Sequence, residues 1–165
     1  MSVATVEVEA VGFDHPDAVL LRDAAVADLG VRYGGDDDAT EVIDPATIVT
    51  TVVVRMDGVL AAGGSIRDVS GTDDGRGRGT FHPAATGEIK RVFVQPEHRR
   101  NGLARRLMDE LERRARQVGF RRLVLETGTA QPEAMAMYER LGYEPIEKYG
   151  RYAVYEQQRC YGKRL

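Results

Sequence analysis

The chain has 165 residues, of which 42% are hydrophobic and 30% charged, and its formal net charge is −3. This length and composition predict one soluble globular domain spanning residues 1–165, and the acidic balance argues against nucleic acid as a partner. The apolar runs are too short for a membrane span, and the first residues lack the pattern of a signal peptide. Because a single cysteine, Cys160, excludes an internal disulfide, we expect a cytoplasmic protein.

Alternation and turn residues predict the elements of the first half of the chain. Apolar and polar residues alternate near the N-terminus, as in a half-buried strand. Two later runs of β-branched residues are joined by Asp57-Gly58, which is the strongest short-range signal for a hairpin. The expected elements are a strand at 3–9, a helix from Asp14 or Asp17 to Gly30, a loop at 31–46, and hairpin strands at 47–56 and 59–67.

The second half combines a glycine-rich loop with two helical patterns. Glycines gather in residues 68–86, which are expected to form a mobile loop within the sheet. The further elements are a strand at 87–94, a helix at about 103–118, a central strand at 121–127, a short helix at 132–141, and C-terminal strands at about 144–149 and 152–164. This order predicts an α/β domain of the mixed α+β kind, with helices on the faces of a mixed sheet.

The turn at residues 99–102 carries the clearest functional signal, because a predicted strand ends before it and a predicted helix begins after it. The first turn of a helix presents backbone N–H groups without partners and about half a positive charge. Gly102 and Ala104 let a ligand approach the backbone closely. The first charged residues in the helix are Arg105 and Arg106, where acidic residues are expected, so a bound anion would compensate them. The turn predicts a diphosphate site; a helix start with solvated arginines is the alternative.

Other catalytic patterns are missing from the sequence. No Gly-x-x-x-x-Gly-Lys-Ser/Thr loop occurs, and the histidines, His15, His82 and His98, do not have the spacing of metal ligands. Cys160 is expected to pack within a strand rather than to act as a nucleophile. We therefore expect no metal in the site.

The segment Arg99-x-x-Gly102-x-Ala104, between a strand and an amphipathic helix, resembles the Gln/Arg-x-x-Gly-x-Gly/Ala signature of the GNAT superfamily of N-acetyltransferases. The similarity continues through residues 125–128 and 134–143 and is closest to small bacterial members. It implies a GNAT-like fold, in which a mixed, mostly antiparallel sheet of six to seven strands is flanked by about four helices. The resemblance also implies that this sheet is splayed between its fourth and fifth strands.

The resemblance further implies that acetyl-CoA is the co-substrate. Its pantetheine arm would pair with the strand backbone of Val92, Phe93 and Val94. Its pyrophosphate would take the backbone amides of Arg100, Asn101, Gly102, Leu103 and Ala104, with Arg99 and Arg105 nearby. Many relatives have an asparagine before the final helix that contacts the cofactor arm; Gln131 stands in that region and is its candidate replacement.

Two residues are candidates for the proton transfers. Tyr138 corresponds to the family's tyrosine near the departing sulfur, where a phenol of pKa about 10 can donate a proton to a thiolate of pKa about 8.5. A purely structural core tyrosine is the alternative. Glu88 matches a strand position at which related enzymes carry a glutamate base; a water, or Glu126 as a second candidate, could serve instead, and Glu88 could simply pair with an arginine.

The sequence thus predicts transfer of an acetyl group from acetyl-CoA to a primary amine of a small molecule or peptide, by direct attack in a ternary complex. A non-catalytic acyl-CoA sensor and a nucleotide-binding regulator are the alternatives. The acceptor is expected to be set by residues 10–46, 68–86 and the loop near 149–152. The run Asp36-Asp37-Asp38 suits a cationic amine, with a solvated loop as the alternative, and the sequence leaves a homodimer open.

Overall fold

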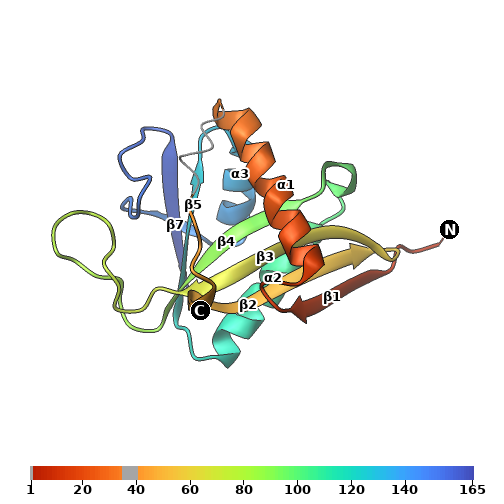
Figure 1. The fold of residues 1–165 in the computed structure, drawn as a ribbon, viewed down its shortest axis with the longest axis horizontal. Helices are drawn as coiled ribbons and strands as arrows, with labels where there is room; N and C mark the ends of the chain where they lie inside the picture. The colour runs from red at the N-terminus through yellow and green to blue at the C-terminus, as the bar shows by residue number, and fades with distance from the viewer. Residues whose placement is uncertain (1, 35–40) are drawn as a thin grey trace.

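A computed structural model describes residues 2–34 and 41–165, which form one seven-stranded sheet with helices on both faces (Figure 1). The strand order is β1-β2-β3-β4-β5-β7-β6, and every neighbouring pair is antiparallel except β4 and β5. The prediction of a mixed, mostly antiparallel sheet is confirmed. The strands are β1 (Val6–Val11), β2 (Ile48–Met56), β3 (Val59–Asp68), β4 (Thr86–Val94), β5 (Arg122–Gly128), β6 (Glu144–Ile146) and β7 (Gln158–Arg164).

The described residues contain the α-helices α1 (Pro16–Tyr33), α2 (Leu103–Gln117) and α3 (Pro132–Arg140), fewer than the four or so expected. Prolines start two further single turns, η2 (Pro45–Thr47) and η3 (Pro96–His98), but neither continues into an α-helix. No helix in the described part of the chain is long and apolar enough to cross a membrane.

Several boundaries differ from the predicted ones. Helix α1 continues through Gly30 to Tyr33, and Gly34, in the left-handed conformation at φ 83°, ends it instead. The C-terminal strands are shorter than predicted, since residues 147–157 form an irregular segment that buries Tyr149.

The two faces of the sheet carry separate apolar clusters because the central strands are buried on both sides. Val52 and Val54 pack in the cluster beneath α2 and α3, whereas Val53 packs with α1 on the opposite face. In β4, Ile89 faces α2, but Phe93, four residues later, faces α1, because a local irregularity in the strand interrupts the alternation. Functional groups on β4 can therefore reach either face.

The sheet opens between β4 and β5. These strands pair only over three positions, Thr86 to Glu88 against Arg122 to Val124, although both continue well beyond them. The predicted splay between the fourth and fifth strands is therefore present in the structure. Beyond Glu88, the edge of β4 that faces β5 has no strand partner among the described residues.

A β-bulge bends β4 where the strands separate. Ser65 of β3 lies opposite Lys90, but Gly63 lies opposite Phe93, so two residues of β4 oppose Gly64 alone. Arg91, within the bulge, has the unusual φ of 56° for a non-glycine residue. Gly64 accommodates the bulge, since a Cβ there would lie 3.0 Å from the side chain of Val92. Such local backbone strain is common at functional sites.

Candidate active site

The predicted anion-binding turn lies at the open end of the gap between β4 and β5. Gly102, at φ 72°, is the N-cap of α2, and the first turn of the helix contains no acidic residue. The first hydrogen bond of the helix runs from the N–H of Arg106 to the carbonyl of Gly102, so the preceding amides lie ahead of the helical ladder. The geometry is that of an anion-binding helix N-terminus.

The arginines of this turn divide into two groups. Arg100 and Arg105 are exposed at the start of α2. Arg99 is half-buried, donates from Nε to the carbonyl of Val94 at 3.0 Å, and lies 3.9 Å from Asp28 of α1. Arg99 therefore links the turn to β4 and α1. Arg100 and Arg105 are the arginines of this turn that face solvent.

The start of α3 is tied to the end of α1 across the gap. Arg32 donates to the carbonyl of Ala130 and pairs with Glu133, while Tyr33 donates to the side-chain oxygen of Gln131 at 3.3 Å. Gln131 is the N-cap residue of α3 but does not cap it through its side chain. The predicted asparagine replacement thus lies at the end of β5 beside the gap, held through its side-chain oxygen.

Tyr138 lies on the α2 face of the sheet. Its side chain is buried, and its ring contacts those of Tyr143 and Tyr161 at centroid distances of 5.9 and 6.3 Å. Burial raises the pKa of its hydroxyl well above the ordinary value, so the phenol stays protonated at neutral and mildly alkaline pH. No hydrogen bond links this hydroxyl to another described side chain, unlike that of Tyr161, which donates to Glu139.

Glu88 lies on the α1 face, almost fully buried at 1% exposure. It accepts a hydrogen bond from Nε of Arg67 at 2.6 Å, and Nζ of Lys90 lies 3.9 Å from the same oxygen. The arginine pairing considered as an alternative is therefore present. Glu88 nevertheless lines a cavity, so the pairing and contact with a ligand are compatible.

Lys90 joins three segments around the point where the strands diverge. Its buried ammonium donates to Glu41, in the segment before β2, at 2.8 Å and to Glu126 of β5 at 3.1 Å. Lys90 and Glu126 lie two residues beyond the last paired residues of their strands, so an ion pair spans the gap where backbone pairing stops. Burial alone would raise the pKa of Glu41, but Lys90 and Arg67 lower it to about 2.

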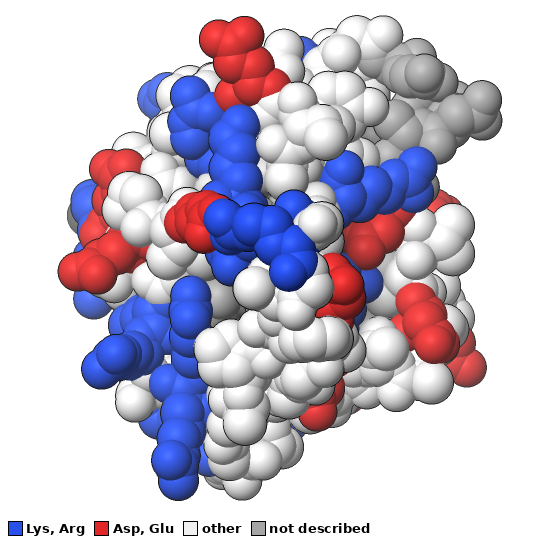
Figure 2. Space-filling view, turned by 90° about the vertical axis from the view of Figure 1, so that its left-hand side faces the viewer, with Lys and Arg blue, Asp and Glu red and all other residues white. Residues whose placement is uncertain are grey.

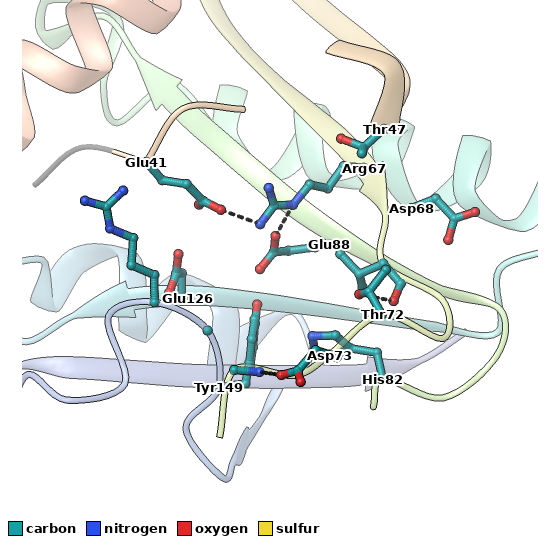
Figure 3. Close-up of a pocket in the computed structure, with 14 residues that line it drawn as sticks. Glu41, Thr47, Arg67, Asp68, Thr72, Asp73, His82, Glu88, Glu126 and Tyr149 are labelled. Carbon is teal, nitrogen blue, oxygen red and sulfur yellow. Dashed lines mark hydrogen bonds and ion pairs between the residues drawn. The ribbon is translucent and has the colours of Figure 1, made fainter. Parts of the chain in front are cut away.

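A cavity of about 310 Å³ lies beside this cluster on the α1 face (Figure 3). It is lined by Glu41, Thr47, Arg67, Asp68, Val69, Thr72, Asp73, Gly75, His82, Glu88, Glu126, Tyr149, Gly150 and Arg151. The loop between β3 and β4 and the loop between β6 and β7 supply most of these residues, and both lie in segments from which the sequence predicts recognition of the acceptor. The loops contact each other, since the N–H of Gly150 donates to the carbonyl of Asp74.

The loop at 68–86 is organised around a buried carboxylate. Asp74 accepts hydrogen bonds from Thr80 at 2.7 Å and from the guanidinium of Arg76 at 3.0 Å, and Arg76 also donates to the carbonyls of Glu147 and Lys148. The loop predicted from glycine content alone is thus fastened to the segment after β6. This fastening fixes one wall of the cavity.

Several residues at or beside the cavity were absent from the sequence prediction. Glu41, Lys90 and Arg67 come together only in the folded chain, from three separate segments. One signal was available: Glu88 and Lys90 are charged residues on either side of Ile89 in a predicted strand, so their side chains had to face the same side of the sheet. The acidic run at 36–38, which suits a cationic acceptor, lies outside the described residues.

The surface near this site is not dominated by one sign of charge. Figure 2 shows basic and acidic side chains interspersed over the face that it draws. Within the described ranges 2–34 and 41–165, no group of three or more His, Cys, Asp or Glu residues is arranged to hold a metal ion.

Comparisons with known proteins agree with this geometry. An IAA acetyltransferase of Azospirillum brasilense is 29% identical over 152 residues, which cover 83% of this chain and 91% of the relative. An acyl-CoA N-acyltransferase assigned in Klebsiella pneumoniae has a similar structure, with a TM-score of 0.75, 24% identity and 98% of each chain covered. The PaiA N-acetyltransferase of Thermoplasma acidophilum, solved with coenzyme A, has a TM-score of 0.67 at 11% identity, with 98% of this chain and 99% of that chain covered.

The family profile described as "Acetyltransferase (GNAT) family" matches residues 21–143, a range that includes the anion-binding turn, the bulge of β4 and most of α1. The matched range also contains β4 and β5, the two strands that separate in the sheet, and helix α3. The chain belongs to the GNAT acetyltransferase family.

Proposed function

We propose that the chain is a single N-acetyltransferase domain that transfers an acetyl group from acetyl-CoA to a primary amine in the cytoplasm. The observation that carries the proposal is the gap between β4 and β5, which ends at the anion-binding turn of α2. The unpaired edge of β4 at Val92, Phe93 and Val94 suits the amides of a pantetheine arm. The amides of residues 100–104, with Arg100 and Arg105, suit the diphosphate.

The two proposed proton-transfer residues lie on opposite faces of the sheet. Glu88 faces the cavity on the α1 side, whereas Tyr138 packs on the α2 side. They can act on one thioester only if it lies between the diverging strands. An amine entering from the cavity would then attack the carbonyl from one face while the sulfur departs toward the other.

In this reaction the amine nitrogen forms a bond to the thioester carbonyl carbon, and the carbon–sulfur bond breaks. Glu88, directly or through a water, accepts the proton that the amine loses. Tyr138 donates its proton to the departing thiolate and is restored from solvent. Acetyl-CoA is a co-substrate here, and no other cofactor enters the balance.

Release of CoA from acetyl-CoA in the presence of a broad amine panel tests the proposal. We expect CoA release with at least one primary amine. Tight binding of acetyl-CoA without release by any amine would instead favour a sensor of acyl-CoA. ADP competing as well as CoA, with no contribution from pantetheine, would favour a nucleotide-binding regulator.

Gly102→Val should weaken CoA binding by at least about tenfold, because a side chain at the N-cap would crowd the backbone that faces the diphosphate. The matched control is Gly58→Val, in the β2–β3 turn. The two glycines have similar φ values (72° and 79°), and at each of them a Cβ would have no atom of another residue within 4 Å beyond its chain neighbours. Calorimetric titration with CoA measures the effect. Equal affinities for the two variants would contradict a diphosphate site at this turn.

Glu88→Gln should lower kcat/KM by about 100-fold near neutral pH, because the amide retains an oxygen to accept from Arg67 but cannot accept a proton. We expect the loss to shrink as pH rises, since more of the acceptor amine is then already neutral. A pH profile of kcat/KM for both proteins checks this. A loss that is constant across the profile would indicate a structural role for Glu88.

A further inference from the structure

The cavity on the α1 face has more fixed negative than positive charge. The carboxylates that line it are Glu41, Asp68, Asp73, Glu88 and Glu126. The cations at or beside it are Arg67, Arg151 and Lys90. Burial lowers the pKa of His82, so this imidazole adds no charge at neutral pH. A site lined in this way favours a ligand that brings positive charge.

The inner carboxylates and the rim carboxylates have different surroundings. Glu88 and Glu126 are bonded to Arg67 and Lys90, so their charge is largely compensated. Within the described part of the chain, Asp68 and Asp73 accept hydrogen bonds only from backbone N–H groups, those of Ser70 and Gly75 at 2.9 and 2.7 Å. The uncompensated charge is therefore at the rim of the cavity, away from Glu88.

Tyr149 supplies a second observation that points to a ligand. Its side chain is 2% exposed and lines the cavity, and burial, together with the nearby carboxylates of Glu88 and Glu126, raises the pKa of its hydroxyl well above the ordinary value. The hydroxyl nevertheless makes no hydrogen bond of acceptable geometry with another described residue. Figure 3 shows this hydroxyl directed toward Glu88 and Glu126. A buried hydroxyl without a partner costs free energy, so a molecule in the cavity is expected to complete its hydrogen bonding.

We propose that this cavity is the acceptor site and that it selects a small amine with a second positive charge, with Tyr149 as a residue that determines its specificity. The inference rests on the proposed acetyl transfer. The reacting amine would lie near Glu88 and the Tyr149 hydroxyl, which can accept an N–H from it. The second ammonium would lie near Asp68 and Asp73 at the rim.

Three acceptors with four carbon atoms each differ in the charge at their far end. We would compare 1,4-diaminobutane, 1-aminobutane and 4-aminobutanoate, whose far groups are cationic, neutral and anionic. We expect kcat/KM for the diamine to exceed that for 1-aminobutane by at least about tenfold, and 4-aminobutanoate to be the poorest. A kcat/KM for 4-aminobutanoate that equals or exceeds the value for the diamine would overturn the inference but would still support acetyl transfer.

The double variant Asp68→Asn/Asp73→Asn keeps side-chain oxygens for the two backbone N–H groups and removes the rim charge. We expect it to reduce the preference for the diamine over 1-aminobutane to about threefold or less. Asp44→Asn is the control, because Asp44 accepts the N–H of Ala46 in the same manner but does not line the cavity. An unchanged preference in the double variant would contradict the placement of the second ammonium.

Tyr149→Phe tests the hydroxyl without changing the ring. We expect KM for the diamine to rise at least about tenfold, with kcat and the affinity for CoA nearly unchanged. Tyr155 lies in the same segment but is 51% exposed, so Tyr155→Phe is the control and should leave KM, kcat and the affinity for CoA unchanged. Equal KM values for wild type and Tyr149→Phe would remove Tyr149 from the site.

The two proposals can fail separately. If the protein does not bind acetyl-CoA and no amine causes release of CoA, the proposed function fails. Calorimetry with 1,4-diaminobutane then tests the proposed cationic-amine site by itself. Binding of the diamine that weakens in Tyr149→Phe would support a cationic-amine site in the cavity. Absence of diamine binding would overturn it.

Discussion

Tyr138→Phe is expected to lower kcat by at least about 100-fold while leaving the dissociation constant for acetyl-CoA within about twofold of the wild type. The phenylalanine keeps the ring contacts with Tyr143 and Tyr161, so only the hydroxyl is lost. Burial keeps this hydroxyl protonated, as a proton donor to the leaving thiolate must be. Steady-state CoA release and calorimetry with acetyl-CoA measure the two constants.

Tyr161→Phe is the matched control for that experiment. Tyr161 belongs to the same aromatic group, but its hydroxyl donates to Glu139 and is already engaged within the protein. We expect its kcat to stay within about threefold of the wild type. If the kcat of Tyr138→Phe also stayed within about threefold of the wild type, water or another group would have to protonate the thiolate. Tyr138 would then be a core residue only.

The sequence predicted well those features that depend on local patterns. Leu103, Leu107 and Leu111 recur at helical spacing, and helix α2 buries all three. Asp57 and Gly58 form the expected tight turn, both with positive φ. The turn before α2 combines a strand end, a glycine and a helix start within a few residues, so its backbone geometry too could be predicted from adjacent positions.

Features that depend on distant contacts could not be predicted in this way. Glu41 meets Lys90 across 49 positions of sequence, and Lys90 meets Glu126 across 36. Helix α1 continues past Gly30 into a last turn in which Arg32 pairs with Asp28 and with the distant Glu133 of α3. The unpartnered hydroxyl of Tyr149 becomes visible only when the loops around it are in place.

Lys90→Met should lower the free energy of unfolding by about 3–5 kcal/mol at pH 7, because it leaves two half-buried carboxylates without their shared cation. Lys90 is 5% exposed and bonded to Glu41 and Glu126, so its removal takes a cation from carboxylates on two separate segments at once. Arg113→Met is the control, since Arg113 also pairs closely with Glu110 but lies at the surface, so its replacement is expected to change the free energy of unfolding little. Urea unfolding measures both.

The pH dependence separates lost charge from lost packing in that variant. In the wild type the pKa of Glu41 is lowered to about 2, so the stability that it contributes is present above about pH 4.5 and is lost as pH falls toward 2. Without Lys90, the half-buried carboxylate of Glu41 should take up a proton at a higher pH, which relieves part of the isolated charge. The difference between wild type and Lys90→Met should therefore narrow between pH 7 and pH 3. If the difference in free energy of unfolding stayed constant over this range, the methionine would destabilise the protein through poor packing. The ion pair across the strand gap would then contribute little to stability.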